Sequence, residues 1–141
     1  MVVLDTNVIS ELLRPKAAGA VVAWLADQPS ASIFTTAITQ AEIIYGVRLL
    51  PDGKRKQELL EAIEPIFAED FAGRVLPFDE DAADAYARLA VARRLAGRPI
   101  SQFDAQIGAI AASRGAAIAT RNVSDFADIG VAVINPWTYA G

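Results

Sequence analysis

The chain has no cysteine and no histidine among its 141 residues. Without cysteine there is no disulfide framework, no thiolate metal site and no thiol nucleophile. Without histidine there is no Ser-His-Asp triad, no histidine general base and no His-ligated zinc. Any metal ion must therefore be held by oxygen ligands, a donor set that favours Mg²⁺ or Mn²⁺.

The sequence also lacks a long apolar run and a targeting segment. No stretch approaches the roughly 18–20 apolar residues that a membrane span needs. Met1 leads directly into a short apolar segment with no basic region before it. We therefore expect a cytoplasmic protein without a membrane partner. The net charge of −4 argues against a protein that coats nucleic acid by charge alone, but allows a local basic rim around an acidic site.

Short apolar segments alternate with helical patterns along the chain. The predicted strands lie at residues 2–5, 32–35, 74–77, 116–120 and 131–134, and the predicted helices lie near residues 7–13, 18–27, 39–50, 54–67, 79–96 and 102–114. This alternation predicts one α/β domain over residues 1–141, with a central, mostly parallel five-stranded sheet flanked by helices on both faces.

Three acidic residues occupy comparable places in this pattern. Asp5 ends the first strand, Glu42 lies at the start of the helix after the second, and Asp104 lies in the first turn of the helix before the fourth. In a parallel sheet these positions can share one edge, where ligands bind. Neighbouring carboxylates repel one another and resist ionisation, and a divalent cation removes that cost. Such an ion can activate water for attack on a phosphodiester.

Helix capping offers a structural alternative for two of these acids. Thr39-x-x-Glu42 fits a capping box, and Ser101-x-x-Asp104 is a looser version of it. Asp5 has no such explanation, because Asn7 is available to cap the first helix. We favour a functional interpretation because all three acids occur at matching places.

The segment after the fourth strand can contribute further polar groups. Thr120 ends its strand as Asp5 ends its own, Asn122 can orient a carboxylate or bind water, and Asp125 can add a charge. An Asx-type turn also explains this segment, and the spacing alone favours that explanation.

Together these residues resemble the PIN-domain ribonucleases of the VapC family, in the FitB-like branch of type II toxin–antitoxin systems. The resemblance extends over about residues 2–137. It is carried by the segments 4–10, 39–42 with Tyr45-Gly46, Asp104 in its alanine-rich helix, 119–126 and 135–137.

The resemblance implies a PIN-like fold and RNA cleavage by activated water with Mg²⁺ or Mn²⁺. It implies a catalytic metal centre formed by Asp5, Glu42 and Asp104. Some members carry a fourth acid where this chain has Asn122, so either Asp125 compensates or one ion suffices. Supporting roles follow for three more residues: Thr6 and Thr120 as polar groups, and Asn7 as a brace for the loop after the first strand.

The same resemblance implies particular partners. It implies a cognate VapB-like antitoxin whose C-terminal segment blocks the acidic cleft. A homodimer is implied as well, with a higher assembly in which the antitoxin holds toxin dimers on operator DNA. The toxin itself is not expected to read DNA sequence.

Basic residues on two predicted helices are candidate RNA contacts. They are Lys54, Arg55, Arg93, Arg94 and Arg98. Solvated helix faces are the alternative, since cations also stabilise a helix C-terminus. Trp24 and Trp137 are expected to serve packing or dimerisation rather than base stacking.

Two other functions are compatible with an acidic cleft. A Mg²⁺-dependent phosphatase with Asp5 as nucleophile would want a second aspartate at position 7 and a lysine near the site. The chain has Asn7, and no lysine lies beyond Lys56; a phosphoacceptor receiver domain fails on the same missing lysine. A non-enzymatic binding partner that has lost its chemistry is the second alternative, with Asn122 as the indication. The RNA target stays open among transfer, ribosomal and messenger RNA.

Overall fold

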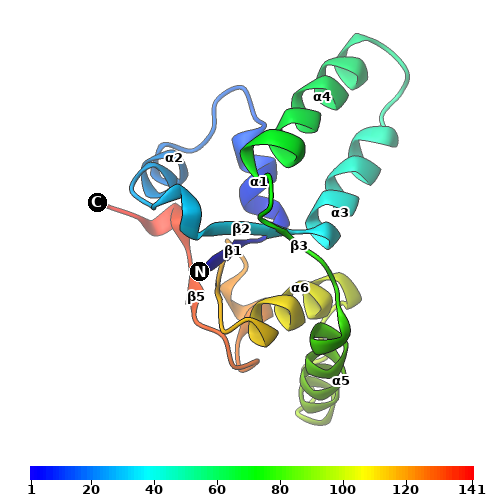
Figure 1. Ribbon diagram of the computed structural model, residues 1–141, viewed down its shortest axis with the longest axis vertical. Helices are drawn as coiled ribbons and strands as arrows, with labels where there is room; N and C mark the ends of the chain where they lie inside the picture. The colour runs from blue at the N-terminus through cyan, green and yellow to red at the C-terminus, as the bar shows by residue number, and fades with distance from the viewer.

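Five short strands form a sheet at the centre of the structure (Figure 1). The computed structural model describes all residues 1–141. The strands are β1 (Val2–Leu4), β2 (Ile33–Thr36), β3 (Val75–Leu76), β4 (Ala117–Ala119) and β5 (Val133–Ile134). Their order across the sheet is β3-β2-β1-β4-β5, and every neighbouring pair is parallel. The predicted fold class is confirmed, and the sheet is wholly parallel.

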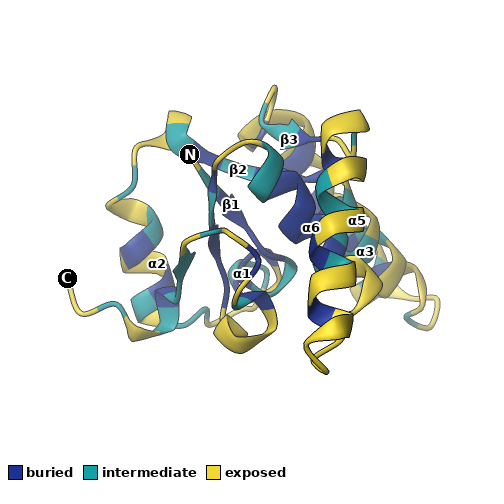
Figure 2. Ribbon diagram, turned by 90° about the horizontal axis from the view of Figure 1, so that it is seen from below, coloured by how far each residue is buried: buried dark blue, intermediate teal, exposed yellow.

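Six α-helices cover the two faces of this sheet (Figure 1). One face carries α1 (Thr6–Leu12), α2 (Gly19–Ala26), α3 (Ala37–Arg48) and α4 (Lys54–Pro65), and the other carries α5 (Glu80–Leu95) and α6 (Gln102–Ser113). Figure 2 shows the buried strand β1 and the buried side of α6, with exposed outer turns on α5. Helices on both faces are what a parallel sheet requires.

The central strands bury alternate side chains in two separate cores. Val3 and Ile118 belong to the core under α5 and α6, whereas Leu4 and Ala119 belong to the core under α1 to α4. All four are fully buried. The apolar character of β1 and β4 therefore follows from burial on both faces. Because these strands are packed on both sides, the residues that follow them are held in fixed positions.

The start of α1 differs from the prediction. Asp5, rather than Asn7, caps this helix: its backbone is extended, and its Oδ1 accepts a hydrogen bond of 2.8 Å from the backbone nitrogen of Thr6. The prediction failed because Asp5 alone separates the strand, which ends at Leu4, from the helix, which begins at Thr6. Asp5 therefore has a structural role in addition to any chemical one.

The start of α3 also differs. The helix begins at Ala37 and is capped by Thr36, whose Oγ1 accepts a 3.0 Å hydrogen bond from the nitrogen of Thr39. Glu42 consequently lies in the second turn and closes no capping box. The capping interpretation of Glu42 is wrong, because the last residue of β2 is itself the cap.

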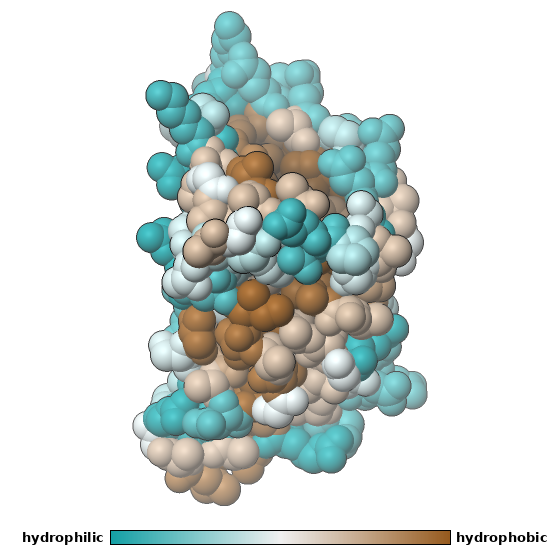
Figure 3. Space-filling view, turned by 90° about the vertical axis from the view of Figure 1, so that its left-hand side faces the viewer, coloured by the Kyte–Doolittle hydropathy of each residue, from teal (hydrophilic) through white to brown (hydrophobic).

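The surface carries apolar side chains between polar ones. Figure 3 shows such apolar areas, broken by polar residues, on the face that carries α2 and the chain ends. Tyr45, Leu49, Val91 and Leu95 are exposed on the C-terminal halves of α3 and α5. None of the helices combines the length and apolar composition of a membrane span.

Candidate active site

A cleft of about 500 Å³ lies at the carboxyl edge of the sheet. Asp5 from the end of β1, Glu42 from α3 and Asp104 from α6 all line it. The structure therefore brings the three acids together, although Glu42 and Asp104 lie 37 and 99 residues after Asp5 in the sequence. The parallel order of the strands causes this convergence, because all their carboxyl ends point the same way.

Asp5 is the most buried of the three, with 4% of its surface exposed. Its Oδ1 accepts from the nitrogen of Thr6 at 2.8 Å, and its Oδ2 accepts from the hydroxyl of Thr120 at 2.8 Å. Each carboxylate oxygen keeps a second acceptor position. The side chain is thus fixed from both sides and still lines the cleft.

Thr120 determines the orientation of the Asp5 carboxylate. The threonine hydroxyl accepts from Asn7 Nδ2 at 3.2 Å and from the nitrogen of Asn122 at 3.0 Å. With both acceptor positions filled, its single proton goes to Asp5. Asn7 also accepts from the nitrogen of Arg121 through its Oδ1, at 3.3 Å. These contacts join the start of α1 to the loop that follows β4.

Glu42 is oriented by two threonines. The Thr6 hydroxyl donates to Glu42 Oε1 at 2.8 Å and lies 3.0 Å from the Thr39 hydroxyl. Since Thr6 has only one hydroxyl proton, Thr39 is the donor of the second contact. Thr39 is fully buried, so this chain of hydroxyls reaches from the core to the cleft.

Asp104 lies in the first turn of α6, as predicted. Ser101 caps this helix, and its Oγ accepts from the nitrogen of Asp104 at 3.2 Å. An acid here also complements the helix dipole. Burial and the charge of Asp125 raise the pKa of Asp104, although Asp125 itself does not line the cleft.

The carboxyl groups of the cleft are hard to ionise in the absence of a cation. Burial, opposed by the hydrogen bonds from Thr120 and Thr6 and reinforced by the charges of Asp104 and Glu42, raises the pKa of Asp5 to about 6. Burial and the charge of Asp104 raise the pKa of Glu42, and burial with the charge of Asp125 raises that of Asp104. Perturbed groups gathered in one cleft are typical of functional sites.

The chemistry of this donor set fits a divalent cation. All its charged donors are carboxylates, as Mg²⁺ prefers. As placed, no three acidic side chains meet closely enough to hold one ion. Glu42 and Asp104 are only partly buried, and their mutual repulsion disfavours closer approach. A cation would remove that repulsion, so the residues suit the ion although they are not preassembled around it.

The predicted basic rim lies elsewhere in the structure. None of its five members, Lys54, Arg55, Arg93, Arg94 and Arg98, lines the cleft. Arg93 is wrong as an RNA contact, because it is only 7% exposed and donates to the carbonyl oxygens of Arg98, Asp125 and Ala127. It ties the end of α5 to the segment that carries Asp125.

The cleft has basic and aromatic residues that sequence reasoning did not assign to it. They are Arg14, Arg121 and Trp137. Arg121 adjoins Asn122 in a segment already suspected of a role, and that adjacency was the available signal. Arg14 offers no comparable signal in the sequence.

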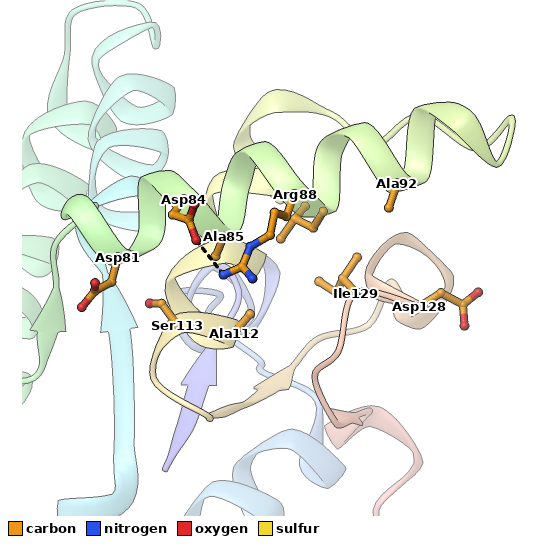
Figure 4. Close-up of a pocket in the computed structure, with 10 residues that line it drawn as sticks. Asp81, Asp84, Ala85, Arg88, Ala92, Ala112, Ser113, Asp128 and Ile129 are labelled. Atoms are coloured by element: carbon orange, nitrogen blue, oxygen red, sulfur yellow. Dashed lines mark ion pairs between the residues drawn. The ribbon is translucent and has the colours of Figure 1, made fainter.

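A second groove, of about 590 Å³, lies between α5, the end of α6 and residues 128–129 (Figure 4). Arg88 and Asp84 form an ion pair in it at 2.6 Å, and Asp128 pairs with Arg98 at 2.9 Å. Two of its three aspartates are therefore already neutralised by arginines. We accordingly place the candidate active site in the cleft at the strand ends.

Comparison with known proteins identifies the family. A model of the PIN domain matches residues 2–131. The chain belongs to the PIN-domain family. It is 42% identical to "VapC ribonuclease Y4jK" of Sinorhizobium fredii over 97% of this chain and 98% of that protein. It is 44% identical to "Toxin FitB" of Neisseria gonorrhoeae over 97% of this chain and 99% of that protein. The resemblance to VapC and FitB proteins is thus confirmed.

Solved structures agree with this placement. The structure of FitAB bound to an IR36 DNA fragment contains a chain 42% identical to this one, with a TM-score of 0.92, covering 100% of this chain and 99% of that one. The PIN domain described here therefore shares its fold with a toxin of known structure over its whole length.

Proposed function

We propose that this PIN-domain protein is the toxin of a type II toxin–antitoxin pair and cleaves RNA phosphodiester bonds in a reaction that requires Mg²⁺ or Mn²⁺. The observation that carries the proposal is the gathering of Asp5, Glu42 and Asp104 in one cleft, where burial and the charges of nearby acids raise their pKa values. The relatives named as ribonuclease and toxin support it.

In this proposal the three carboxylates hold the ion and their neighbours hold the carboxylates. When bound, Mg²⁺ makes a water molecule more acidic and neutralises charge that develops on the phosphate. The Thr120 hydroxyl keeps Asp5 in place, and the Thr6 hydroxyl does the same for Glu42. These two hydroxyls orient the carboxylates at the cleft, and the acids would draw closer together when the ion binds.

The test is cleavage of total cellular RNA by the purified protein with Mg²⁺, with Mn²⁺ and with EDTA. We expect discrete fragments with either metal and none with EDTA, and sequencing of the cut ends would identify the RNA target. A phosphomonoester, p-nitrophenyl phosphate, is the control substrate. Its hydrolysis without RNA cleavage would instead support the phosphatase, and inactivity on both would support a binding partner without chemistry.

Asn122 stands where some members of the family carry an acid, and it lines the cleft. We expect Asn122→Asp to tighten Mg²⁺ binding severalfold, because a fourth carboxylate adds attraction for the ion. Calorimetric titration of the metal measures this effect. The matched control is Gln102→Glu, which adds the same charge at an exposed position. Equal affinities for both variants would give Asn122 a purely structural role.

We further propose an antitoxin partner and a homodimer. The related FitAB structure, bound to DNA, supports an assembly of this kind. The exposed apolar side chains of α3 and α5 are candidates for such contacts, since surfaces of this kind commonly bind other proteins. The cleft would be closed by the antitoxin in the cytoplasm until the antitoxin is removed.

A further inference from the structure

Arg121 is held in an unusual position for a charged side chain. Its guanidinium lies 5.2 Å from the centre of the Trp137 ring, within the range of a cation–π contact. The guanidinium has no hydrogen bond or ion pair within the protein, and both residues line the cleft. Its five donors are therefore free to bind a ligand that enters the cleft.

Arg14 reaches the same cleft from the other end of α1. Glu11, only 6% exposed, accepts from the nitrogen of Ala18 at 3.0 Å and from Arg14 Nη1 at 3.3 Å. The buried carboxylate thus anchors both the loop after α1 and one nitrogen of Arg14. The rest of the Arg14 side chain, 66% exposed, faces solvent at the cleft.

The cleft therefore combines the three candidate metal ligands with two arginines, of which Arg121 is unpaired and Arg14 is paired with Glu11 through one nitrogen only. No hydrogen bond or ion pair joins Arg14 or Arg121 to Asp5, Glu42 or Asp104. Asp5 precedes α1 and Arg14 follows it, and the 7 residues of this helix span about 10 Å at 1.5 Å per residue. A metal centre at one place and guanidinium groups with unused donors beside it match a chain of successive phosphates, since arginine binds phosphate with paired hydrogen bonds.

We propose that Arg14 and Arg121 form a subsite for the RNA phosphates next to the one that is cleaved, with Trp137 as the support that positions Arg121. The inference rests on the proposed ribonuclease function and goes beyond it by naming residues that position the substrate. The indole face of Trp137 is occupied by the guanidinium, so a base would stack on the arginine rather than on the tryptophan.

Salt-dependent RNA binding tests the subsite. The probe is a short fluorescein-labelled single-stranded RNA of mixed sequence, bound to protein carrying Asp104→Asn so that it stays intact. Each phosphate contact contributes about 0.7 to the slope of log K against log salt for a single strand. We expect Arg14→Ala and Arg121→Ala each to lower the slope by about this amount and to weaken binding severalfold. Thermal unfolding should change little for Arg121→Ala, whereas Arg14→Ala should lower the melting temperature slightly because buried Glu11 loses its ion pair.

Three further variants separate charge from position. Arg48→Ala removes an exposed, unpaired arginine that lies outside the cleft and should leave the slope unchanged. Arg121→Lys should restore the slope without restoring full affinity, because lysine lacks the planar group that stacks on Trp137. Trp137→Leu should weaken binding with the slope retained.

The outcomes distinguish this inference from the proposed function. If the parent protein cleaves RNA with metal but both alanine variants keep the parent slope, the subsite is overturned and the ribonuclease function stands. If the alanine variants have lowered slopes but the parent protein never cleaves RNA, the subsite is supported and the proposed ribonuclease function is overturned. If the alanine variants lose binding to an acidic antitoxin peptide but bind RNA as the parent does, the two arginines serve antitoxin binding instead and the inference is overturned.

Discussion

Asp5→Asn should abolish RNA cleavage and, in the absence of metal, make the protein more stable. Cleavage should fall at least about 10³-fold, because the variant loses a charged ligand from the proposed metal centre. The stability gain follows from burial. Asp5 has a pKa of about 6 in the folded protein and an ordinary value near 3.9 when unfolded, so above pH 6 the folded state contains a charge that is better solvated in the unfolded chain.

The size of that gain can be estimated. A difference of about two pKa units corresponds to about 3 kcal/mol. Asparagine has a single side-chain oxygen, so it can accept from Thr6 or from Thr120 but not from both, and loss of one hydrogen bond offsets about 1 kcal/mol. The net gain of about 2 kcal/mol should raise the melting temperature by about 5 °C at pH 7.5 with EDTA.

Asp70→Asn is the control for this experiment, since Asp70 is exposed and lies outside the cleft. It should alter neither activity nor melting temperature. Asp104→Asn should match Asp5→Asn in its loss of cleavage. An Asp5→Asn protein that still cleaves RNA would contradict the proposed metal centre. An inactive variant with a lower melting temperature in the absence of metal would show that the capping role of Asp5 outweighs the cost of its buried charge.

Mg²⁺ should stabilise the parent protein at neutral pH and not in acid. The raised pKa of Asp5 means that the folded state takes up protons more readily than the unfolded state between about pH 4 and 6. Stability of the metal-free protein should therefore fall as the pH rises through this range and then level off. Glu42 and Asp104, whose pKa values are raised as well, act in the same direction.

Added Mg²⁺ should reverse this loss above pH 6. At a concentration about 100-fold above its dissociation constant, the ion contributes about 2.7 kcal/mol, which corresponds to a rise of about 8 °C in melting temperature for a chain of this size. At pH 4.5 the carboxyl group of Asp5, with its pKa of about 6, is largely protonated, and the rise should disappear. Differential scanning fluorimetry at both pH values, with Asp5→Asn beside the parent, measures it. An equal rise at pH 4.5, or in the variant, would place the bound ion elsewhere.

The fold and the acidic centre were predictable because their signals are local. Each strand is a short apolar segment, and Asp5 stands out because a carboxylate directly follows one of them. The parallel order then brings distant acids to one edge. The helix caps were less predictable: Thr36 and Thr39 are both suitable caps three residues apart, and only the end of β2 decides between them.

The residues that sequence reasoning misplaced depend on distant partners. Arg93 looks like one of several exposed arginines, yet its partners include carbonyl groups 32 and 34 residues away. Arg121 contacts the ring of Trp137, and this contact depends on the place of β5 in the sheet, because Trp137 follows that strand. Neither partnership leaves a pattern of spacing or composition in the sequence.

The hydrogen bond between Thr120 and Asp5 has a consequence for the timing of activity. It joins residues 115 positions apart, and β1 pairs on that side with β4, which begins at Ala117. During synthesis, Asp5 leaves the ribosome among the first residues but lacks this partner until most of the chain has been made. A growing or truncated chain therefore cannot complete the site, and a newly made toxin would become competent only in the last moments of its own translation.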